Sequence, residues 1–223
     1  SLRGSRRMLL AARGAFALAS IATVASFGRL MYLCANHQFQ FQYVFDYTSP
    51  DLGWPFVYAA TWAGQEGSFL LWAFWTALIG GLVAWKAGKW ENRVMPFYLS
   101  TLAVLFAICV WLSPFNLIPR GTGPGQYPPD LPWPPEFGKG LNPSLQNYWM
   151  AIHPPTIFFG FVSLSIPFAY AIAAMIWRDY GSSQNQAGWA PRVMPWTLMA
   201  VATLGAGLFL GGQLGPGFAH LPP

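Results

Sequence analysis

The feature that most constrains this fold is a set of long apolar runs, each close to the length of a membrane crossing. A helix needs about 20 mostly apolar residues to cross the hydrocarbon core of a bilayer. Only 9% of the chain is charged, against about 25% in soluble domains. The runs that qualify cover residues 8–33, 67–85, 94–113, 148–177 and 194–212. We therefore predict an all-α membrane protein with about five transmembrane helices joined by extended, proline-rich outer loops.

Residues 1–212 form one multi-pass membrane domain in this interpretation, with no separate soluble domain and no internal repeat. Basic residues are dispersed between the apolar runs rather than gathered on one face, so the sequence does not indicate nucleic-acid binding. Cys34 and Cys109 lie at or inside apolar runs, which is typical of small buried hydrophobic residues. The chain has no CxxCH motif and is therefore not itself a c-type cytochrome.

The distribution of basic residues predicts the orientation, because cytoplasmic connections are enriched in Lys and Arg. Segments 1–13, 86–93 and 178–192 are the richer ones for their length, with four, three and two basic residues, whereas 34–66 has none and the longer segment 114–147 has two. The N-terminus and the two other basic connections are thus predicted to face the cytoplasm or matrix. The alternate connections face the opposite compartment, which we call outer.

The two outer connections are unusual in composition. Residues 38–45 alternate polar and apolar side chains, which predicts a strand or a segment lying extended along the interface. Trp54, Tyr58 and Trp62 suit an interfacial aromatic belt. Prolines recur throughout 114–147, which excludes a regular helix and favours an ordered extended loop.

Three histidines, His37, His153 and His220, fall on the predicted outer side, and histidine is a common ligand of metals and of haem iron. His153 is followed by Pro154 and Pro155. Proline is tolerated in the first turn of a helix, so the pair predicts a helix start with His153 at its mouth. The alternative is that the prolines are helix-entry residues only and that His153 ligates nothing.

A second polar feature, Gln65 with Glu66, stands between glycines directly before the run 67–85. It is either a polar site at the outer interface or an anion that complements the helix dipole. The motifs of serine hydrolases, zinc proteases and P-loop enzymes do not occur. Charged residues inside the spans are few, which gives an ion or proton pathway little support.

Three segments together resemble a known family. Residues 62–72, Trp-Ala-Gly-Gln-Glu-Gly-Ser-Phe-Leu-Leu-Trp, resemble the WxGQEGSxLLW signature of the CcmF/NrfE-type cytochrome c haem lyases. Residues 141–147 followed by Ile152-His153-Pro154-Pro155 resemble that family's LNPLLQ…HPP element, and 39–47 resembles its F-x-x-x-YV-x-x-Y segment. Order and spacing agree over residues 10–212.

The resemblance implies a component of System I cytochrome c maturation in a bacterial or mitochondrial inner membrane. Such proteins receive haem b from a haem chaperone and promote its attachment to CxxCH of apocytochrome c. The resemblance assigns His153 as an outer axial ligand of the haem iron. It makes Gln65, Glu66, Trp62 and Trp72 a supporting surface.

Departures from the family leave three alternatives open. Family members begin with another transmembrane segment and continue past Gly211-Gly212 into a tryptophan-rich WWD loop and further ligand histidines. Residues 213–223 diverge from that pattern, and His220 matches no family ligand. The chain is then a piece of a split lyase, a part of a longer sequence, or a shortened non-catalytic subunit of a respiratory or photosynthetic complex. Haem lyase activity would require a partner portion that carries the WWD loop.

Overall fold

The computed structural model describes residues 2–179 and 188–212, and these residues are nearly all helical. The α-helices are α1 (Leu2–Ala35), α2 (Gln42–Tyr47), α3 (Trp54–Ala60), α4 (Gln65–Ala87), α5 (Glu91–Trp111), α6 (Tyr148–Trp177) and α7 (Ala190–Gly212). Two 3-10 helices, η1 (Gly88–Trp90) and η2 (Pro143–Leu145), complete the order. The described residues contain isolated β-bridges but no strand, which confirms the all-α prediction.

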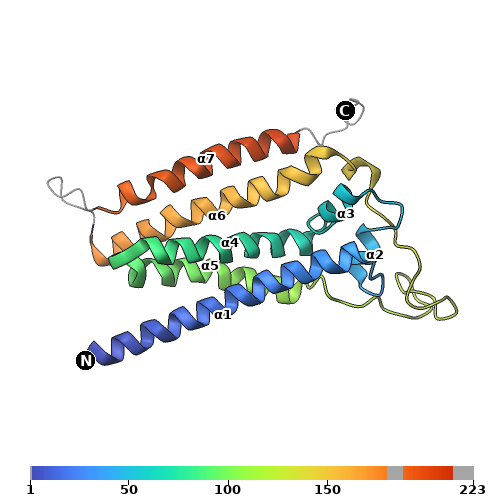
Figure 1. Cartoon of the computed structure of the whole chain (residues 1–223), viewed down its shortest axis with the longest axis horizontal. Coiled ribbons are helices and arrows are strands. Elements are labelled where there is room, and N and C mark those ends of the chain that lie inside the picture. Colours follow the sequence, from blue (N-terminus) through green and yellow to red (C-terminus); the bar gives the residue numbers. More distant parts are fainter. Residues whose placement is uncertain (1, 180–187, 213–223) are drawn as a thin grey trace.

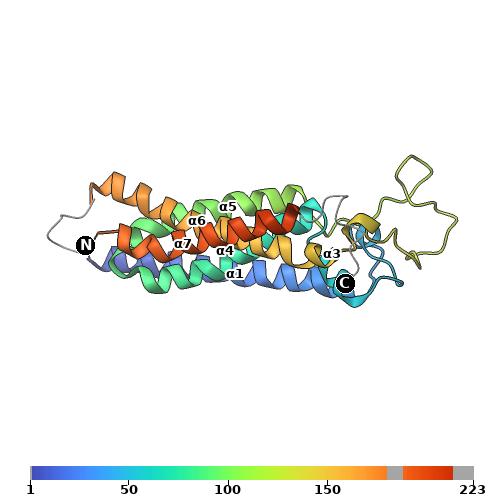
Figure 2. The same cartoon turned by 90° about the horizontal axis from the view of Figure 1, so that it is seen from above.

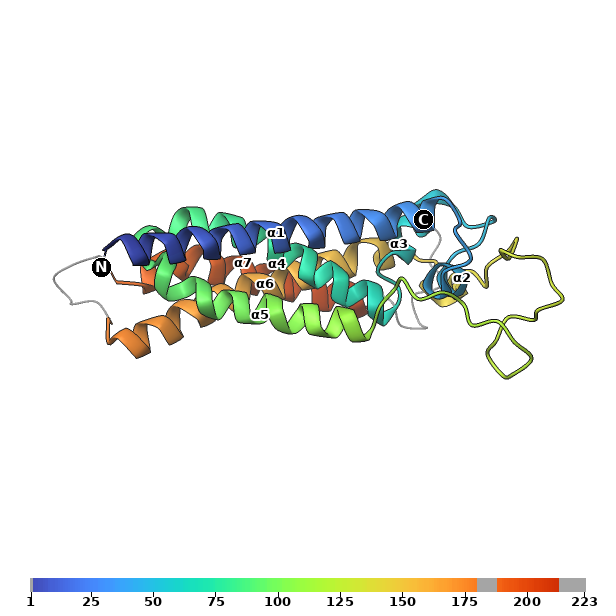
Figure 3. The ribbon, with the colours of Figure 1, turned by 90° about the horizontal axis from the view of Figure 1, so that it is seen from below.

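Five long helices run side by side, and α4 occupies the centre, where it contacts α1, α5 and α6 (Figures 1 and 2). Helix α7 packs on α6, while α1 and α5 form the opposite face of the bundle (Figure 3). The short helices α2 and α3 and the segment 112–147 gather at one end, beside the start of α6 (Figure 1). We call this the loop end. The start of α1, η1 and the start of α7 lie at the other, basic end.

Four stretches are long and apolar enough to cross a membrane, as expected of a multi-pass membrane protein. They are Leu9–Ala35, Gln65–Trp111, Ala151–Trp177 and Ala190–Gly212. The stretch Gln65–Trp111 has 47 residues and contains both α4 and α5, which fold back on each other at η1. A single crossing takes about 20 residues. The count of five crossings stays a prediction, and the orientation does too.

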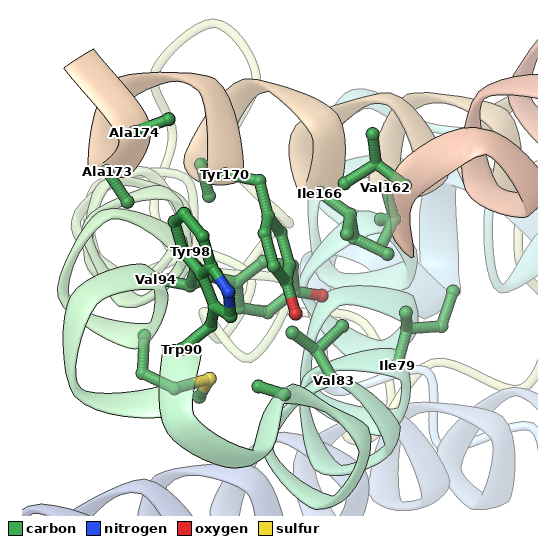
Figure 4. Close-up of a cluster of buried hydrophobic side chains, with 14 residues drawn as sticks. Ile79, Val83, Trp90, Val94, Tyr98, Val162, Ile166, Tyr170, Ala173 and Ala174 are labelled. Carbon is green, nitrogen blue, oxygen red and sulfur yellow. The ribbon is translucent and has the colours of Figure 1, made fainter. Parts of the chain in front are cut away.

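A buried apolar cluster joins α4, α5 and α6 near the basic end (Figure 4). Tyr170 and Ile166 point from α6 toward Val83 of α4, and Trp90 closes the cluster from η1. Tyr98 of α5 is fully buried and donates its hydroxyl hydrogen to the Thr76 carbonyl at 2.8 Å. Burial of these large side chains fixes α4, α5 and α6 against one another.

Two ion pairs hold the basic end together. Arg13 of α1 donates through Nε and Nη2 to both carboxylate oxygens of Glu91, at 2.7 and 2.6 Å. Arg93 of α5 pairs with Asp179, just beyond α6, at 2.8 Å. The bidentate geometry of the first pair makes it the stronger of the two.

Of the two alternatives predicted for residues 38–45, the strand is wrong. Helix α2 begins at Gln42, and the extended part contributes one antiparallel bridge, Phe41 with Leu117. Tyr43 and Val44 of α2 are both buried, although adjacent residues of a strand would point to opposite faces. The alternation of polar and apolar residues was too short to distinguish the two-residue period of a strand from the 3.6-residue period of a helix. The prediction for 114–147 is confirmed, because its described structure contains only bridges, turns and η2.

Candidate functional site

His153 lies on α6 at the loop end of the bundle and faces α7. Its Nδ1 atom is 2.7 Å from the carbonyl oxygen of Gly207. A carbonyl oxygen can only accept a hydrogen bond, so Nδ1 carries the hydrogen, and in the neutral imidazole Nε2 then has the lone pair. No hydrogen bond to Nε2 is made by the described residues. This is the arrangement in which histidine ligates a metal, with the second ring nitrogen oriented by a backbone acceptor.

Glycines on both helices allow the close approach that His153 requires. A Cβ atom at Gly211 would lie 2.6 Å from Cε1 and 2.9 Å from Nδ1 of His153. A Cβ at Gly207 would lie 2.8 Å from Cβ of Ile157, and one at Gly160 would lie 2.7 Å from Cγ of Leu204. The face of α7 that meets α6 therefore cannot carry side chains near the imidazole.

The prolines after His153 do not begin the helix, contrary to the sequence-based prediction. Helix α6 starts at Tyr148, where the Asn147 side chain accepts a hydrogen bond from the Trp149 amide at 3.0 Å. This N-cap decides the start, because it satisfies an amide of the first turn. Pro154 and Pro155 lie inside the helix and remove two amide donors there. His153 thus sits in the second turn rather than at the mouth.

The segment 62–72 and the segment 39–47 pack directly on each other through Tyr43. The Tyr43 hydroxyl is 2.9 Å from the carbonyl oxygen of Ala60 and 3.0 Å from that of Thr61, and it accepts from the amide of Gly64 at 3.1 Å. Burial raises the pKa of Tyr43 well above its usual value, so the hydroxyl stays protonated and can donate. The Tyr43 hydroxyl therefore fixes the position of the loop between α3 and α4 relative to α2.

The two glycines of the 62–72 signature are required by this contact. A Cβ at Gly64 would lie 2.6 Å from the Tyr47 ring. A Cβ at Gly67 would run into the Thr61 carbonyl oxygen and the Tyr43 hydroxyl. The signature is therefore, at these positions, a packing requirement that sets where α4 begins.

Glu66 stands in the first turn of α4, and Gln65 is its exposed first residue. The N-cap Gly64 offers no side chain, so the Glu66 carboxylate is the group that complements the positive end of the helix dipole. No ion pair to Glu66 is found among the described residues. Burial, followed by the Glu66 charge, raises the pKa of Tyr47. The placement supports the helix-dipole interpretation, and the outer polar site stays a prediction.

The two signature tryptophans lie at different depths of the bundle. The Trp62 carbonyl accepts from the Ser68 hydroxyl at 2.9 Å, at the turn into α4. Trp72 lies deeper on α4, and its ring is 5.7 Å from the Phe158 ring and 5.4 Å from the Phe161 ring of α6. Trp72 therefore stabilises the contact between α4 and α6.

Of the predicted site residues, the structure brings His153 together with α7 rather than with the 62–72 signature. Ile157 and Gly160, which contact α7, share the face of His153, whereas Phe158 and Phe161 face Trp72. No hydrogen bond or ring contact joins His153 to Gln65, Glu66 or Trp72 within the described residues.

The other candidate residues have less structural support as ligands. His37 follows α1 with a φ of 50° and stacks on Phe39 at 5.5 Å, and its Nδ1 is buried without a described partner. His220 lies outside the described residues. Cys34 is buried and Cys109 partly so, and both are free thiols. The described residues hold no group of three His, Cys, Asp or Glu that could bind a metal ion.

Sequence reasoning missed the roles of Tyr43 and Gly207. Tyr43 was part of a quoted motif, but nothing in the pattern showed that its hydroxyl binds three backbone groups. The glycines of 194–212 form a pattern that permits close helix packing. They could not show that His153, 54 residues away, is the side chain that fills the space.

Replacing Tyr43 with phenylalanine should lower the free energy of unfolding by about 2 kcal/mol, because the Gly64 amide would lose its acceptor and the carbonyls of Ala60 and Thr61 would lose a donor. The matched control is Tyr47→Phe, whose hydroxyl makes no hydrogen bond within the described residues and which should change stability by less than about 0.5 kcal/mol. Chemical unfolding in detergent, followed by circular dichroism, measures both. Equal stability of the two variants would contradict the role given to the Tyr43 hydroxyl.

Comparison with known proteins identifies this architecture. The family model described as cytochrome c assembly protein matches residues 62–213. The cytochrome c-type biogenesis protein CcmF of Pseudomonas aeruginosa is 34% identical in an alignment 219 residues long, which covers 94% of this chain and 30% of that protein. The probable cytochrome c-type biogenesis protein NrfE of Escherichia coli is 28% identical, covering 94% of this chain and 36% of the relative.

A solved structure agrees with the sequence relatives. The protein titled cytochrome c heme lyase CcmF matches with a TM-score of 0.58 and 31% identity, over 88% of this chain and 29% of that one. The chain thus spans about a third or less of the length of these relatives. The resemblance drawn from the three motifs is confirmed: the family model covers more than half of the chain, and this chain belongs to the cytochrome c assembly protein family.

Proposed function

We propose that this chain takes part in cytochrome c maturation and that His153 supplies one axial ligand to haem at the loop end of the bundle. The observation that carries the proposal is the hydrogen bond from His153 Nδ1 to the Gly207 carbonyl at 2.7 Å. It fixes the tautomer in which Nε2 has a free lone pair, and neutral imidazole nitrogen is the usual protein ligand of haem iron.

The surroundings of His153 fit a flat, largely apolar cofactor. His153 is only partly buried, so its ring can be reached from outside the bundle. Trp149 lies four residues before His153 and therefore on the same face of α6, and it is in ring contact with the exposed Tyr148 at 5.7 Å. Aromatic rings beside an oriented imidazole offer both stacking and ligation.

Haem, when bound, supplies an iron that accepts the imidazole and vinyl groups to which the cysteine thiols of CxxCH add. Residues of this chain hold and orient the imidazole. Gly207 accepts the Nδ1 hydrogen, and Gly211 leaves room for the ring. The portion of the lyase that carries the WWD loop would supply a further ligand of the haem iron, and Gln65, Glu66 and Trp62 would support the outer surface. A haem chaperone and apocytochrome c would be the partners on that side.

The proposed orientation places the loop end in the periplasm or intermembrane space and the basic end in the cytoplasm or matrix. Its support is the positive-inside rule together with the fold, which gathers 36–64 and 112–147 at one end and the start of α1, η1 and the start of α7 at the other (Figure 1). His153 would then face the compartment in which c-type cytochromes are assembled.

The test is haem titration of the full chain in phosphatidylcholine nanodiscs, followed by visible absorption. We expect His153→Ala to lose the imidazole-type spectrum and to weaken haem binding about tenfold or more. His37→Ala, the matched control at the same end, should bind within about twofold of the unmodified chain. If both variants keep the spectrum and the affinity, His153 is not the ligand. Co-expression with the WWD portion then measures cytochrome c maturation directly.

A further inference from the structure

A groove at the basic end of the bundle, far from His153, combines an apolar floor with two cations. It has a volume of about 480 Å³ and lies between α4, α6 and α7. Val83 and Ile166 are buried in its floor, and Trp196 and Met199 form the α7 wall. Lys86, in the last turn of α4, and Arg192, in the first turn of α7, line its polar end.

The positive charge of this groove has no counter-ion among the residues that the structure describes. The chain has seven acidic residues, and all of them lie in its described part. At the basic end, Glu91 is bound by Arg13 and Asp179 by Arg93. The five others are at the loop end: Asp46, Asp51, Glu66, Asp130 and Glu136. Residues 180–187, which precede α7, contain no Asp or Glu. No described ion pair involves Lys86 or Arg192.

A second groove at the same end differs in charge, because its cation is paired with a carboxylate. It has a volume of about 300 Å³ and is lined by Phe16, Met95 and Leu99, together with Arg13 and Glu91. The cation there is neutralised by the bidentate carboxylate. Both grooves can take an acyl chain, but only the first offers uncompensated positive charge beside it.

We propose that the groove between α4, α6 and α7 binds an anionic phospholipid of the membrane in which the chain resides. Its phosphate lies between Lys86 and Arg192, and an acyl chain runs along Ile166 and Met199. Basic pockets between transmembrane helices are typical sites for anionic lipid headgroups. Arg192 also stands at the N-terminal end of α7, where the helix dipole favours an anion. Since α7 packs chiefly on α6, a lipid shared by α4 and α7 would fix the start of α7 to the bundle.

The test is native mass spectrometry of the full chain titrated with phosphatidylglycerol or phosphatidylcholine. One cation near a charged lipid contributes about fivefold in affinity. Lys86→Gln with Arg192→Gln should therefore weaken phosphatidylglycerol binding about 25-fold. Lys89→Gln with Arg178→Gln removes the same charge from exposed positions outside the groove and should weaken it less than about threefold. Phosphatidylcholine binding should not change in either variant.

Several outcomes would overturn this assignment. Equal losses in the two double variants would mean that the general positive potential attracts the lipid and that the groove does not. No preference of the unmodified chain for phosphatidylglycerol over phosphatidylcholine would exclude recognition of charge. Displacement of the lipid by millimolar inorganic phosphate would make the site one for a free anion. Met199→Trp, which narrows the apolar part, should lower lipid affinity while Lys86 and Arg192 stay in place, and unchanged affinity would exclude an acyl chain there.

Discussion

Gly67→Ala should lower the free energy of unfolding by about 3 kcal/mol, more than any other single methyl addition where α2 and α4 meet at the loop end. The added Cβ would meet the Thr61 carbonyl oxygen and the Tyr43 hydroxyl, and neither can move freely. The carbonyl is backbone, and the hydroxyl is held by Ala60, Thr61 and Gly64. Relief would require α4 to withdraw from α2, which would break these hydrogen bonds as well.

The same helix provides the matched control. A Cβ at Gly81 meets nothing within 4 Å, so Gly81→Ala should be neutral or stabilising by up to about 1 kcal/mol, since alanine is the better helix former. Chemical unfolding of both variants in detergent gives the comparison. If Gly67→Ala unfolds at the same denaturant concentration as Gly81→Ala, the 62–72 signature does not serve the packing role that the structure gives it.

The helices could be predicted from the sequence because apolar runs of this length have few other solutions in a membrane. The run 148–177 coincides with α6 (Tyr148–Trp177). The run 194–212 starts later than α7 (Ala190–Gly212), because hydropathy detects the membrane core and not the polar first turn that contains Arg192. The strand over 38–45 was wrong because eight residues of alternation cannot outweigh the burial of the adjacent residues Tyr43 and Val44, which a short helix allows.

The sequence singles out His153 as the candidate ligand, which stays a prediction, but it does not show which groups orient the imidazole. His153 was singled out by residue type, by its position at a span and by the motif around it. Its partner Gly207 depends on which face of α7 meets α6, and that is decided by glycines at 160, 207 and 211 acting together. Similarly, the motif that contains Trp72 suggested a surface role, whereas the contacts with Phe158 and Phe161 place the ring between helices.

Gly211→Ala should weaken haem binding by about 10- to 100-fold, the range seen when the group orienting a ligating histidine is disturbed. This prediction rests on the proposed role of His153. The new methyl would lie 2.6 Å from Cε1 and 2.9 Å from Nδ1 of the imidazole, so the ring must turn away. Turning would lengthen the bond to the Gly207 carbonyl, which is 2.7 Å in the undisturbed site, and Nε2 would no longer be held in one direction.

Gly212→Ala is the control for this experiment, because it adds the same methyl one residue further along α7, where nothing lies within 4 Å. Haem titration and thermal unfolding should be measured on both variants. A loss of affinity confined to Gly211→Ala, with similar unfolding temperatures, would separate the position of the imidazole from general stability. Equal affinities would mean that the Nδ1 hydrogen bond does not orient the ligand, even if His153 itself is required. Because the alanine leaves His153 in the chain, this pair of variants tests the orienting contact and not the presence of the ligand.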